Sequence, residues 1–335
     1  MPTINDVARA AGVSPSTVSY VLSGRRPISA QTRERVQAAI AELGFHPHAG
    51  ARALASSKTN VLALVAPLRL DVNVPVIMQF ATAVVTASRT HNHDVLLLTK
   101  DEGTAGLERV AHSTMVDALI VMDIEREDVR LPALRGLKQP SVLIGLPNDP
   151  LGIACVDLDF AAAAGEALRH LAWHGHRKIA LVGPSPAVYR RGTTYAERFL
   201  TGFTEASESL GLRTLAHPCE PDVEGVRACL DDIDAQLPGA TALVVHNEEA
   251  LRPLLDLLRA RGKRVPEDLS IVAICPRDVA INMPLPLTSV DIPAHDVGGL
   301  AVETAMRLLD GRSIEPVRLL PPTLVERDSC EPPRR

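Results

Sequence analysis

The stretch TINDVARAAGVSPSTVSYVLSG, residues 3–24, decides the fold of the N-terminal part of this chain of 335 residues. Thr3 and Asp6 form an S/T-x-x-D/E pattern, in which each side chain caps the backbone of the other at a helix start. Gly12 tolerates the positive φ with which many helices end. The pattern therefore predicts a short helix over residues 4–11.

A second helix start follows at once. Ser14 is a good N-cap residue, and Pro15 suits the first helical position because its missing N–H is not needed there. The predicted helix over residues 15–22 has an apolar stripe formed by Val18, Val21 and Leu22. Short polar or hydrogen-bonding side chains lie largely off this stripe: Ser16, Thr17, Ser19 and Tyr20. Such side chains suit an approach to another surface.

A third helix is predicted from Ser29 to Gly44, with Val36, Ile40 and Leu43 on one face. Two short helices joined by a Gly-containing turn and supported by a third form a helix-turn-helix, whose second helix enters the major groove of DNA. The alternative is a small helical cap that packs on the rest of the chain. The turn and the polar face of the second helix favour DNA.

Charge is distributed unevenly along the sequence. Residues 1–60 hold seven Lys or Arg and three Asp or Glu, a net charge of +4, while the remainder carries −9. A basic head on an acidic body indicates a polyanion partner at the N-terminal end only.

Composition indicates a soluble protein of about two domains with a small extra module. Apolar residues make up 46% and charged residues 22% of the chain, as in ordinary globular proteins. There is neither an export signal nor an apolar run of about 18 residues, so we expect a cytoplasmic, nucleoid-associated protein. The five cysteines include no C-x-x-C pair and fit reduced thiols.

The segment GFHPHAGARALASSKTN, residues 44–60, contains an Ala-rich run over residues 49–56. This run is too short to be a stable helix alone in water, and Gly50 weakens it further, by ~1 kcal/mol relative to Ala. We therefore expect a linker that becomes helical only against a partner.

These motifs resemble those of a known family. The pattern TI-x-DVA-x-x-AGVS-x-x-TVS-x-VL over residues 3–22, with LGF-x-P at 43–47 and AR-x-L at 51–54, is similar to the head and hinge of the LacI/GalR family of bacterial transcription regulators. The resemblance implies an all-α helix-turn-helix head over residues 1–46 and a hinge helix over residues 47–60.

The resemblance also implies a homodimer whose heads read the halves of a pseudo-palindromic operator, with the hinge helices in the minor groove. It assigns base reading to Pro15, Ser16 and Tyr20, and a minor-groove wedge to Leu54. Tyr20 stands where many members carry Arg, so a bidentate contact from Arg to guanine is absent there. Residues expected to contact or position the DNA backbone are Thr3, Ser14, Thr17, Ser19, Arg25, Arg26, Arg33 and Arg52.

From Val61 onward, apolar runs alternate with helix-length stretches. The runs are VLALVAP, DVLLLT, DALIVM, SVLIG, KIALVG, TALVVH and LSIVAI. Such runs predict parallel strands covered on both faces, in two halves with a cleft between them. This α/β body, residues 61–330, resembles the family's periplasmic-binding-protein-like effector domain of two parallel-sheet subdomains, most clearly in GHRKIALVG and RVPEDLSIVAI.

The chain of such a domain crosses between halves several times. We expect one subdomain from about 61–159 with 290–320, and the other from about 160–289 with 321–330, the chain returning to the first half from about Thr288.

The effector residues match the family less well. The family's Arg-x-x-Gly-Phe motif has Phe199 at the Arg position, with Arg198 one residue earlier. Asn247-Glu248 replaces an Asn-Asp pair, and Cys275 replaces the first Asp of an Asp-Asp turn. The candidate cleft residues are Arg198, Phe199, Asn247 and Cys275. Because unpaired buried polar groups weaken binding, no sugar is assigned as the effector.

Three alternatives remain beside a ligand-responsive repressor: a regulator without a small-molecule effector, a cytoplasmic solute-binding protein and an α/β enzyme. No phosphate-binding loop, nucleophile elbow or dinucleotide fingerprint occurs, so no enzyme activity and no cofactor is expected. His174-Gly175-His176 is interpreted as a helix end in which Gly175 has positive φ, and no metal is expected there. The C-terminal residues lack a leucine heptad, which argues against a tetramerising coiled coil.

Overall fold

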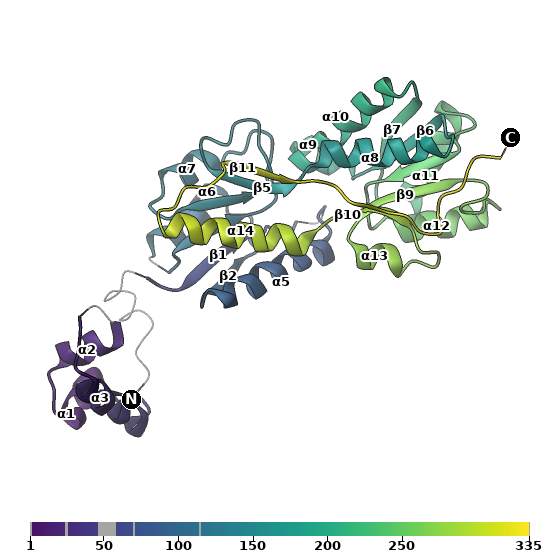
Figure 1. Ribbon diagram of the computed structural model, residues 1–335. Coiled ribbons are helices and arrows are strands. Elements are labelled where there is room, and N and C mark those ends of the chain that lie inside the picture. The colour runs from purple at the N-terminus through teal and green to yellow at the C-terminus, as the bar shows by residue number, and fades with distance from the viewer. Residues whose placement is uncertain (1, 24–25, 46–57, 70, 114, 335) are drawn as a thin grey trace.

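The computed structural model describes residues 2–23, 26–45, 58–69, 71–113 and 115–334. Within these ranges the chain forms a small all-helical head and two α/β lobes (Figure 1). The expected fold class is confirmed. None of the helices in the described part of the chain combines the length and the apolar character needed to span a membrane.

The head consists of helices α1 (Ile4–Ala11), α2 (Pro15–Ser23) and α3 (Ala30–Leu43). Both hydrogen bonds of the Thr3 and Asp6 capping box are present, and Gly12 ends α1 with a φ of 64°. The core of the head is formed by Val7, Ala8, Ala11, Val18, Val36, Ala39 and Phe45. The predicted helix starts are therefore confirmed, and the helix-turn-helix has a core of its own.

The first lobe is built on a sheet of six parallel strands in the order β11-β5-β4-β3-β1-β2. The strands are β1 (Val61–Val65), β2 (Asp94–Leu98), β3 (Ala118–Val121), β4 (Ser141–Ile144), β5 (Ala154–Leu158) and β11 (Val317–Leu320). Helices α5 (Val74–Thr90) and α14 (Ala294–Leu309) cover one face, and α6 (Gly103–His112) and α7 (Leu131–Gly136) the other. Both faces are buried, which explains the continuous apolar runs of the central strands.

The second lobe repeats this plan in the order β12-β10-β9-β8-β6-β7, with only the β10–β12 pair antiparallel among the described strands. The strands are β6 (Lys178–Gly183), β7 (Arg213–Pro218), β8 (Ala242–Val245), β9 (Ser270–Cys275), β10 (Thr288–Asp291) and β12 (Leu324–Val325). Helices α8 (Phe160–Trp173) and α10 (Thr194–Ser209) cover one face, and α11 (Val223–Gln236) and α12 (Leu251–Ala260) the other. Two short helices, α9 (Pro186–Arg191) and α13 (Arg277–Ile281), follow β6 and β9.

The described chain passes between the lobes after β5, after β10 and after β11. The second passage begins after Asp291, slightly later than the expected return at about Thr288, because strand β10 still pairs with β9 in the second sheet. One apolar cluster extends through both lobes and includes Phe160 and Ile292, which lie at two of these passages. The cleft between the lobes lies beside them.

Close packing of α8 against α10 predicts the effect of one substitution. A Cβ atom at Gly202 of α10 would lie 2.3 Å from the backbone oxygen of Ala161 in α8. Because helix backbone must move to remove this overlap, we expect Gly202→Ala to destabilise the protein by roughly 2 kcal/mol or more. The urea midpoint of unfolding, followed by circular dichroism, measures the loss.

Gly136→Ala is the matched control, because a Cβ at Gly136 meets nothing within 4 Å and its φ is not positive. We expect its midpoint to equal or slightly exceed that of the native chain. Equal midpoints for the two variants would show that α8 and α10 are not packed as described.

Candidate functional sites in the head and the inter-lobe cleft

The first turn of α2 is the exposed polar end of the head. Val18 is fully buried in the core, whereas Ser14, Pro15 and Ser16 are exposed. The Ser14 hydroxyl accepts a hydrogen bond from the Thr17 backbone N–H at 3.1 Å, as expected of an N-cap residue. The buried Val18 therefore fixes helix α2 to the core of the head, while the exposed residues at the N-terminus of α2 can contact a partner.

Tyr20 and Arg26 form a pair beside this turn. The Arg26 guanidinium lies over the Tyr20 ring, 5.0 Å from its centroid. Ser19 is half-buried, and Arg33 on α3 is exposed. DNA contacts are expected at Ser19, Tyr20, Arg26 and Arg33. The Arg26 guanidinium lies next to Tyr20, which is expected to read a base.

Thr3 is already engaged within the head. Its hydroxyl donates to the Asp6 carboxylate at 2.7 Å, and this hydrogen bond is the main reason that the pKa of Asp6 is lowered. The expected DNA residues Arg25, Arg52 and Leu54 lie outside the described residues, as does most of the hinge over residues 47–60.

The cleft between the lobes holds two adjoining cavities. The inner cavity has a volume of about 120 Å³ and an apolar wall that includes Val76, Phe80 and Ile144. The outer cavity has a volume of about 250 Å³ and is lined chiefly by loops of the second lobe. The residues common to both linings are Asn73, Tyr195, His246 and Glu248. A ligand at this junction would contact both lobes.

Aromatic rings form one wall of the junction. The His246 ring lies 5.6 Å from the Phe160 ring and 5.5 Å from the Tyr195 ring, between centroids. Phe199 packs against His246 from beneath, at 4.4 Å. Burial lowers the pKa of His246 to about 3, so its imidazole is neutral at pH 7.

An arginine from the second lobe bridges to carboxylates of the first. Arg191, at the end of α9, pairs with Asp71 and with Asp123, the latter at 3.0 Å. Arg69 of the first lobe pairs with Asp123 as well. Backbone hydrogen bonds lie alongside: the Arg126 N–H donates to the Gly192 carbonyl at 2.7 Å. We refer to the ion pairs of Arg191 as the inter-lobe latch.

The four effector residues expected from the sequence occupy different places. Asn247 lines the outer cavity, where its amide donates to the carbonyls of Gly183 and Cys219. Arg198 donates to Asp157 at 2.7 Å and to the Leu158 carbonyl at 2.8 Å, so it ties α10 to β5. Phe199 and Cys275 are fully buried and support the cleft from beneath.

Sequence reasoning did not select Tyr195, His246, Glu248 or Arg191. His246 and Glu248 directly follow strand β8, and the carboxyl ends of parallel strands are where ligands bind in open α/β sheets. Their position after a strand end could therefore have identified His246 and Glu248 from the sequence. No such signal identified Arg191, because its partners Asp71 and Asp123 are remote in sequence.

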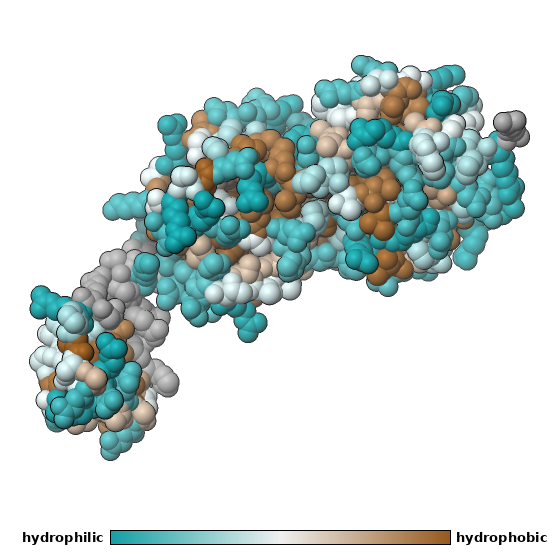
Figure 2. All heavy atoms as spheres, in the orientation of Figure 1, coloured by the Kyte–Doolittle hydropathy of each residue, from teal (hydrophilic) through white to brown (hydrophobic). Residues whose placement is uncertain are grey.

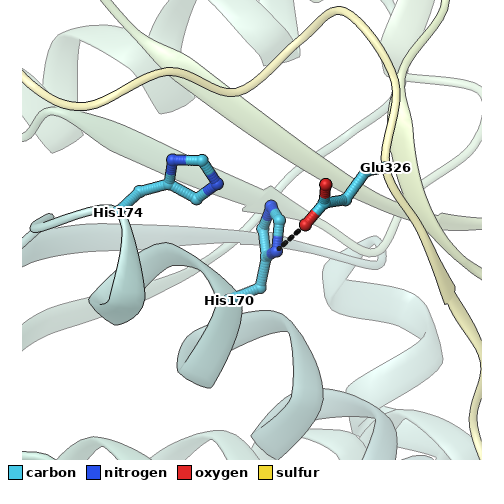
Figure 3. Close-up of side chains that lie close together, drawn as sticks. All are labelled: His170, His174 and Glu326. Carbon is cyan, nitrogen blue, oxygen red and sulfur yellow. Dashed lines mark ion pairs between the residues drawn. The ribbon is translucent and has the colours of Figure 1, made fainter.

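One group of three side chains in the described ranges could hold a metal ion: His170, His174 and Glu326, each with a ligand atom within 4.8 Å of the others (Figure 3). His170 Nδ1 lies 3.4 Å from a Glu326 oxygen, a contact that joins α8 to the C-terminal segment. His176 lies apart from this group, with contacts to Thr241 and to the Glu331 carbonyl. Gly175 has a φ of 99°, which confirms the predicted positive φ.

Comparison with known proteins identifies the class. Residues 3–48 match the family of bacterial regulatory proteins, lacI family, and residues 168–330 match the periplasmic binding protein-like domain. The HTH-type transcriptional regulator CelR of Thermobifida fusca is 30% identical over 95% of both chains. GalR of Escherichia coli is 29% identical, covering 99% of this chain and 97% of its own. The chain therefore belongs to the LacI family of transcriptional regulators, and such relatives are regulators rather than enzymes.

Solved structures agree with the fold. The lac repressor dimer bound to operator and the anti-inducer ONPF has a TM-score of 0.84 at 22% identity, covering 98% of this chain and 99% of its own. The complex of the regulator CelR with cellobiose has a TM-score of 0.68 at 28% identity, covering 98% and 100%.

The latch generates a prediction about motion between the lobes. Arg191→Ala removes the second-lobe partner of Asp71 and Asp123, so the lobes should separate more often. We expect hydrogen exchange at the Arg126 and Thr194 amides, which donate across the cleft, to accelerate about tenfold or more. Exchange rates read by NMR or mass spectrometry test this.

Arg190→Ala is the control, because Arg190 is the exposed neighbour of Arg191 on the same short helix. Its exchange rates at both amides should match those of the native chain. If Arg191→Ala also leaves them unchanged, the latch does not hold the lobes together.

Glu248 generates a prediction about pH. Burial raises the pKa of its carboxyl from 4.5 to about 7, so the folded protein binds a proton there that the unfolded chain has lost. This contribution to stability is present below pH 4.5 and is lost as the pH rises towards 7. Glu248→Gln should flatten that part of the stability curve, measured by thermal unfolding between pH 4.5 and 7.

The remaining slope in this range comes partly from Asp157, whose pKa burial raises to about 6. Glu205→Gln, at an exposed position on α10 away from the cleft, should leave the curve unchanged. A Glu248→Gln curve identical to the native one would show that this carboxyl is solvated.

Proposed function

We propose that this regulator is a repressor that binds a pseudo-palindromic operator as a homodimer and responds to a small ligand in the inter-lobe cleft. It acts on DNA in the bacterial cytoplasm and has no catalytic activity. The exposed first turn of α2, held by the Ser14 cap and a buried Val18, is the observation that carries the proposal.

In the head, Pro15, Ser16 and Tyr20 are assigned to base reading. The exposed polar turn and the Arg26 guanidinium beside Tyr20 support this assignment, since Arg26 supplies a positive charge for phosphates next to the reading surface. Arg33 is assigned to the DNA backbone. The hinge and the Leu54 wedge lie outside the described residues and are proposed from the family pattern alone.

The homodimer is proposed to form along α5, α13 and the start of α14. A groove of about 1080 Å³ follows these helices across both lobes, with Met78, Ile281 and Pro293 among its lining residues. Ile281 is 47% exposed, and apolar patches interrupt the largely hydrophilic surface of both lobes (Figure 2). A dimer face that spans both lobes would register their relative movement.

The path from cleft to head is proposed to begin at Asp117. Its carboxylate accepts hydrogen bonds from the backbone N–H groups of Thr59 at 2.7 Å and Asn60 at 2.8 Å, immediately before β1. The segment leading to the hinge is therefore fixed to the first lobe. Ligand binding that shifts this lobe within the dimer would change the separation of the two hinge origins and so alter operator affinity.

Site selection from a random duplex library, with full-length protein at near-physiological salt, tests the function. We expect enrichment of a pseudo-palindrome with a pyrimidine–purine step at its centre, where wedge insertion is easiest. Tyr20→Ala should lose discrimination at the base pair it contacts in each half-site, by roughly 1–3 kcal/mol.

Arg33→Ala is the matched comparison for the phosphate contacts. It should weaken binding about equally for all sequences and lower the salt dependence by about one ion. A changed site preference in Arg33→Ala, or an unchanged one in Tyr20→Ala, would contradict the assigned roles. Failure of any sequence to enrich would contradict the proposed function.

A further inference from the structure

The C-terminal end of α8 and the segment after β12 bring two histidines and a carboxylate together (Figure 3). His170 and His174 are four positions apart on the helix, so both lie on the same side of it. Glu326 belongs to the C-terminal segment, which follows the third passage between the lobes. One ligand atom from each side chain lies within 4.8 Å of the others. The cluster therefore joins two parts of the second lobe that are remote in sequence.

The ring nitrogens of His170 are not committed to the protein. The side chain is only 7% exposed, and its Nε2 has no hydrogen-bond partner among the described residues. Its Nδ1 lies 3.4 Å from a Glu326 oxygen, longer than the roughly 2.7–3.2 Å of an N–H···O hydrogen bond. A buried imidazole without a firm partner is costly, which indicates a ligand that the described chain does not supply.

The side chains of His174 and Glu326 are available as well. The His174 ring contacts other rings, with centroids 4.7 Å from His170 and 4.9 Å from Trp173, and it forms no side-chain hydrogen bond with any described residue. Glu326 has His170 as its single side-chain contact within the described chain. All three side chains can therefore turn a lone pair towards the same point.

The arginines that flank the two histidines are engaged elsewhere. Arg169 donates to Glu166 at 2.9 Å, and Arg177 donates to the Ala172 carbonyl at 3.0 Å. In the part of the chain that the structure describes, neither arginine pairs with Glu326. Its carboxylate is therefore available to a cation from solution.

Spacing and ligand type select the ion. Zn²⁺ binds histidine nitrogen at about 2.0–2.1 Å and carboxylate oxygen at about 2.0–2.2 Å, so two ligands of a tetrahedral ion lie about 3.4 Å apart. The His170 Nδ1 and the Glu326 oxygen already have this separation. Glu326 is 68% exposed and His174 is half-buried, so small rotations can bring the third ligand into range. Two imidazoles and one carboxylate suit Zn²⁺, Co²⁺ and Ni²⁺, whereas Mg²⁺ and Ca²⁺ prefer oxygen ligands alone.

We propose that His170, His174 and Glu326 bind a divalent transition metal ion of the Zn²⁺ type, which fastens the C-terminal segment to α8. Three protein ligands leave a position for water on the solvent side of Glu326. His176 is not a ligand, because both of its ring nitrogens already contact the protein. None of the three ligands lines either cavity of the cleft, so the site goes beyond the proposed function.

The fluorescence of Trp173 provides a local test. It is the single tryptophan of the chain, and its ring lies beside that of His174, whereas the chain has 11 histidines that a bulk titration would not separate. Co²⁺ quenches tryptophan at short range and Zn²⁺ does not. We expect Co²⁺ to quench Trp173 saturably in the untagged full-length protein at pH 7, and Zn²⁺ to reverse the quenching. Absence of saturable quenching, or competition by Ca²⁺ as strong as that by Zn²⁺, would contradict the proposal.

Glu326→Gln removes the charged ligand at an exposed position and keeps its size. It should weaken Co²⁺ binding about tenfold or more, and His170→Gln should do the same. Glu303→Gln, at an exposed position on α14 of the first lobe, should bind Co²⁺ as the native chain does. Thermal unfolding verifies that each variant is folded. Equal affinity for Glu326→Gln and the native chain would overturn the assignment of this ligand set.

Hydrogen exchange tests whether the ion fastens the segment. The Arg327 amide, next to Glu326, donates to the Thr288 hydroxyl oxygen at 2.9 Å. A Zn²⁺ concentration that just saturates the native chain should slow exchange at this amide about tenfold, and the effect should be much smaller in Glu326→Gln. If exchange in the native chain does not change on Zn²⁺ binding, the ion does not hold the C-terminal segment to α8.

Discussion

The arrangement of the two lobes depends on the contact of Arg191 with carboxylates across the cleft. The Asp123 side chain is only 4% exposed, and a buried charge without partners carries a cost of several kcal/mol. Its two arginine partners, Arg69 and Arg191, come from different lobes. Full neutralisation of Asp123 therefore requires the lobes to be closed, and the cavities take their shape from that closure.

The sequence predicts most of the fold because the central strands are buried on both faces and are apolar throughout. Strands β7, β10, β11 and β12 were missed because each is short or interrupted by polar residues, in contrast to the edge strand β2, whose residues 95–98 are all apolar. Strand β5 was missed for another reason. It contains Asp157, a buried carboxylate whose partner Arg198 is 41 positions further along the chain. Periodicity cannot reveal a charge that is neutralised at such a distance.

The distance in sequence between interacting residues also explains why the head was easier to predict than the cleft. The helices of the head were predictable because their caps join groups three positions apart, as between Ser14 and Thr17. The cleft assembles side chains from segments far apart in the chain, so the sequence alone indicated only the strand ends that face it. Substitutions relative to the family pattern, such as Phe199 and Cys275, fit this picture: both became buried supports for the cleft.

A cavity whose two walls are joined by ion pairs has a kinetic consequence. The junction residues come from both lobes, so each opening of the latch separates the contacts of a molecule bound among them. The lifetime of the bound state then reflects the frequency of lobe opening as well as the strength of ligand contacts. In such a regulator, operator affinity would lag behind a fall in ligand concentration. The delay would equal the time that the lobes take to separate.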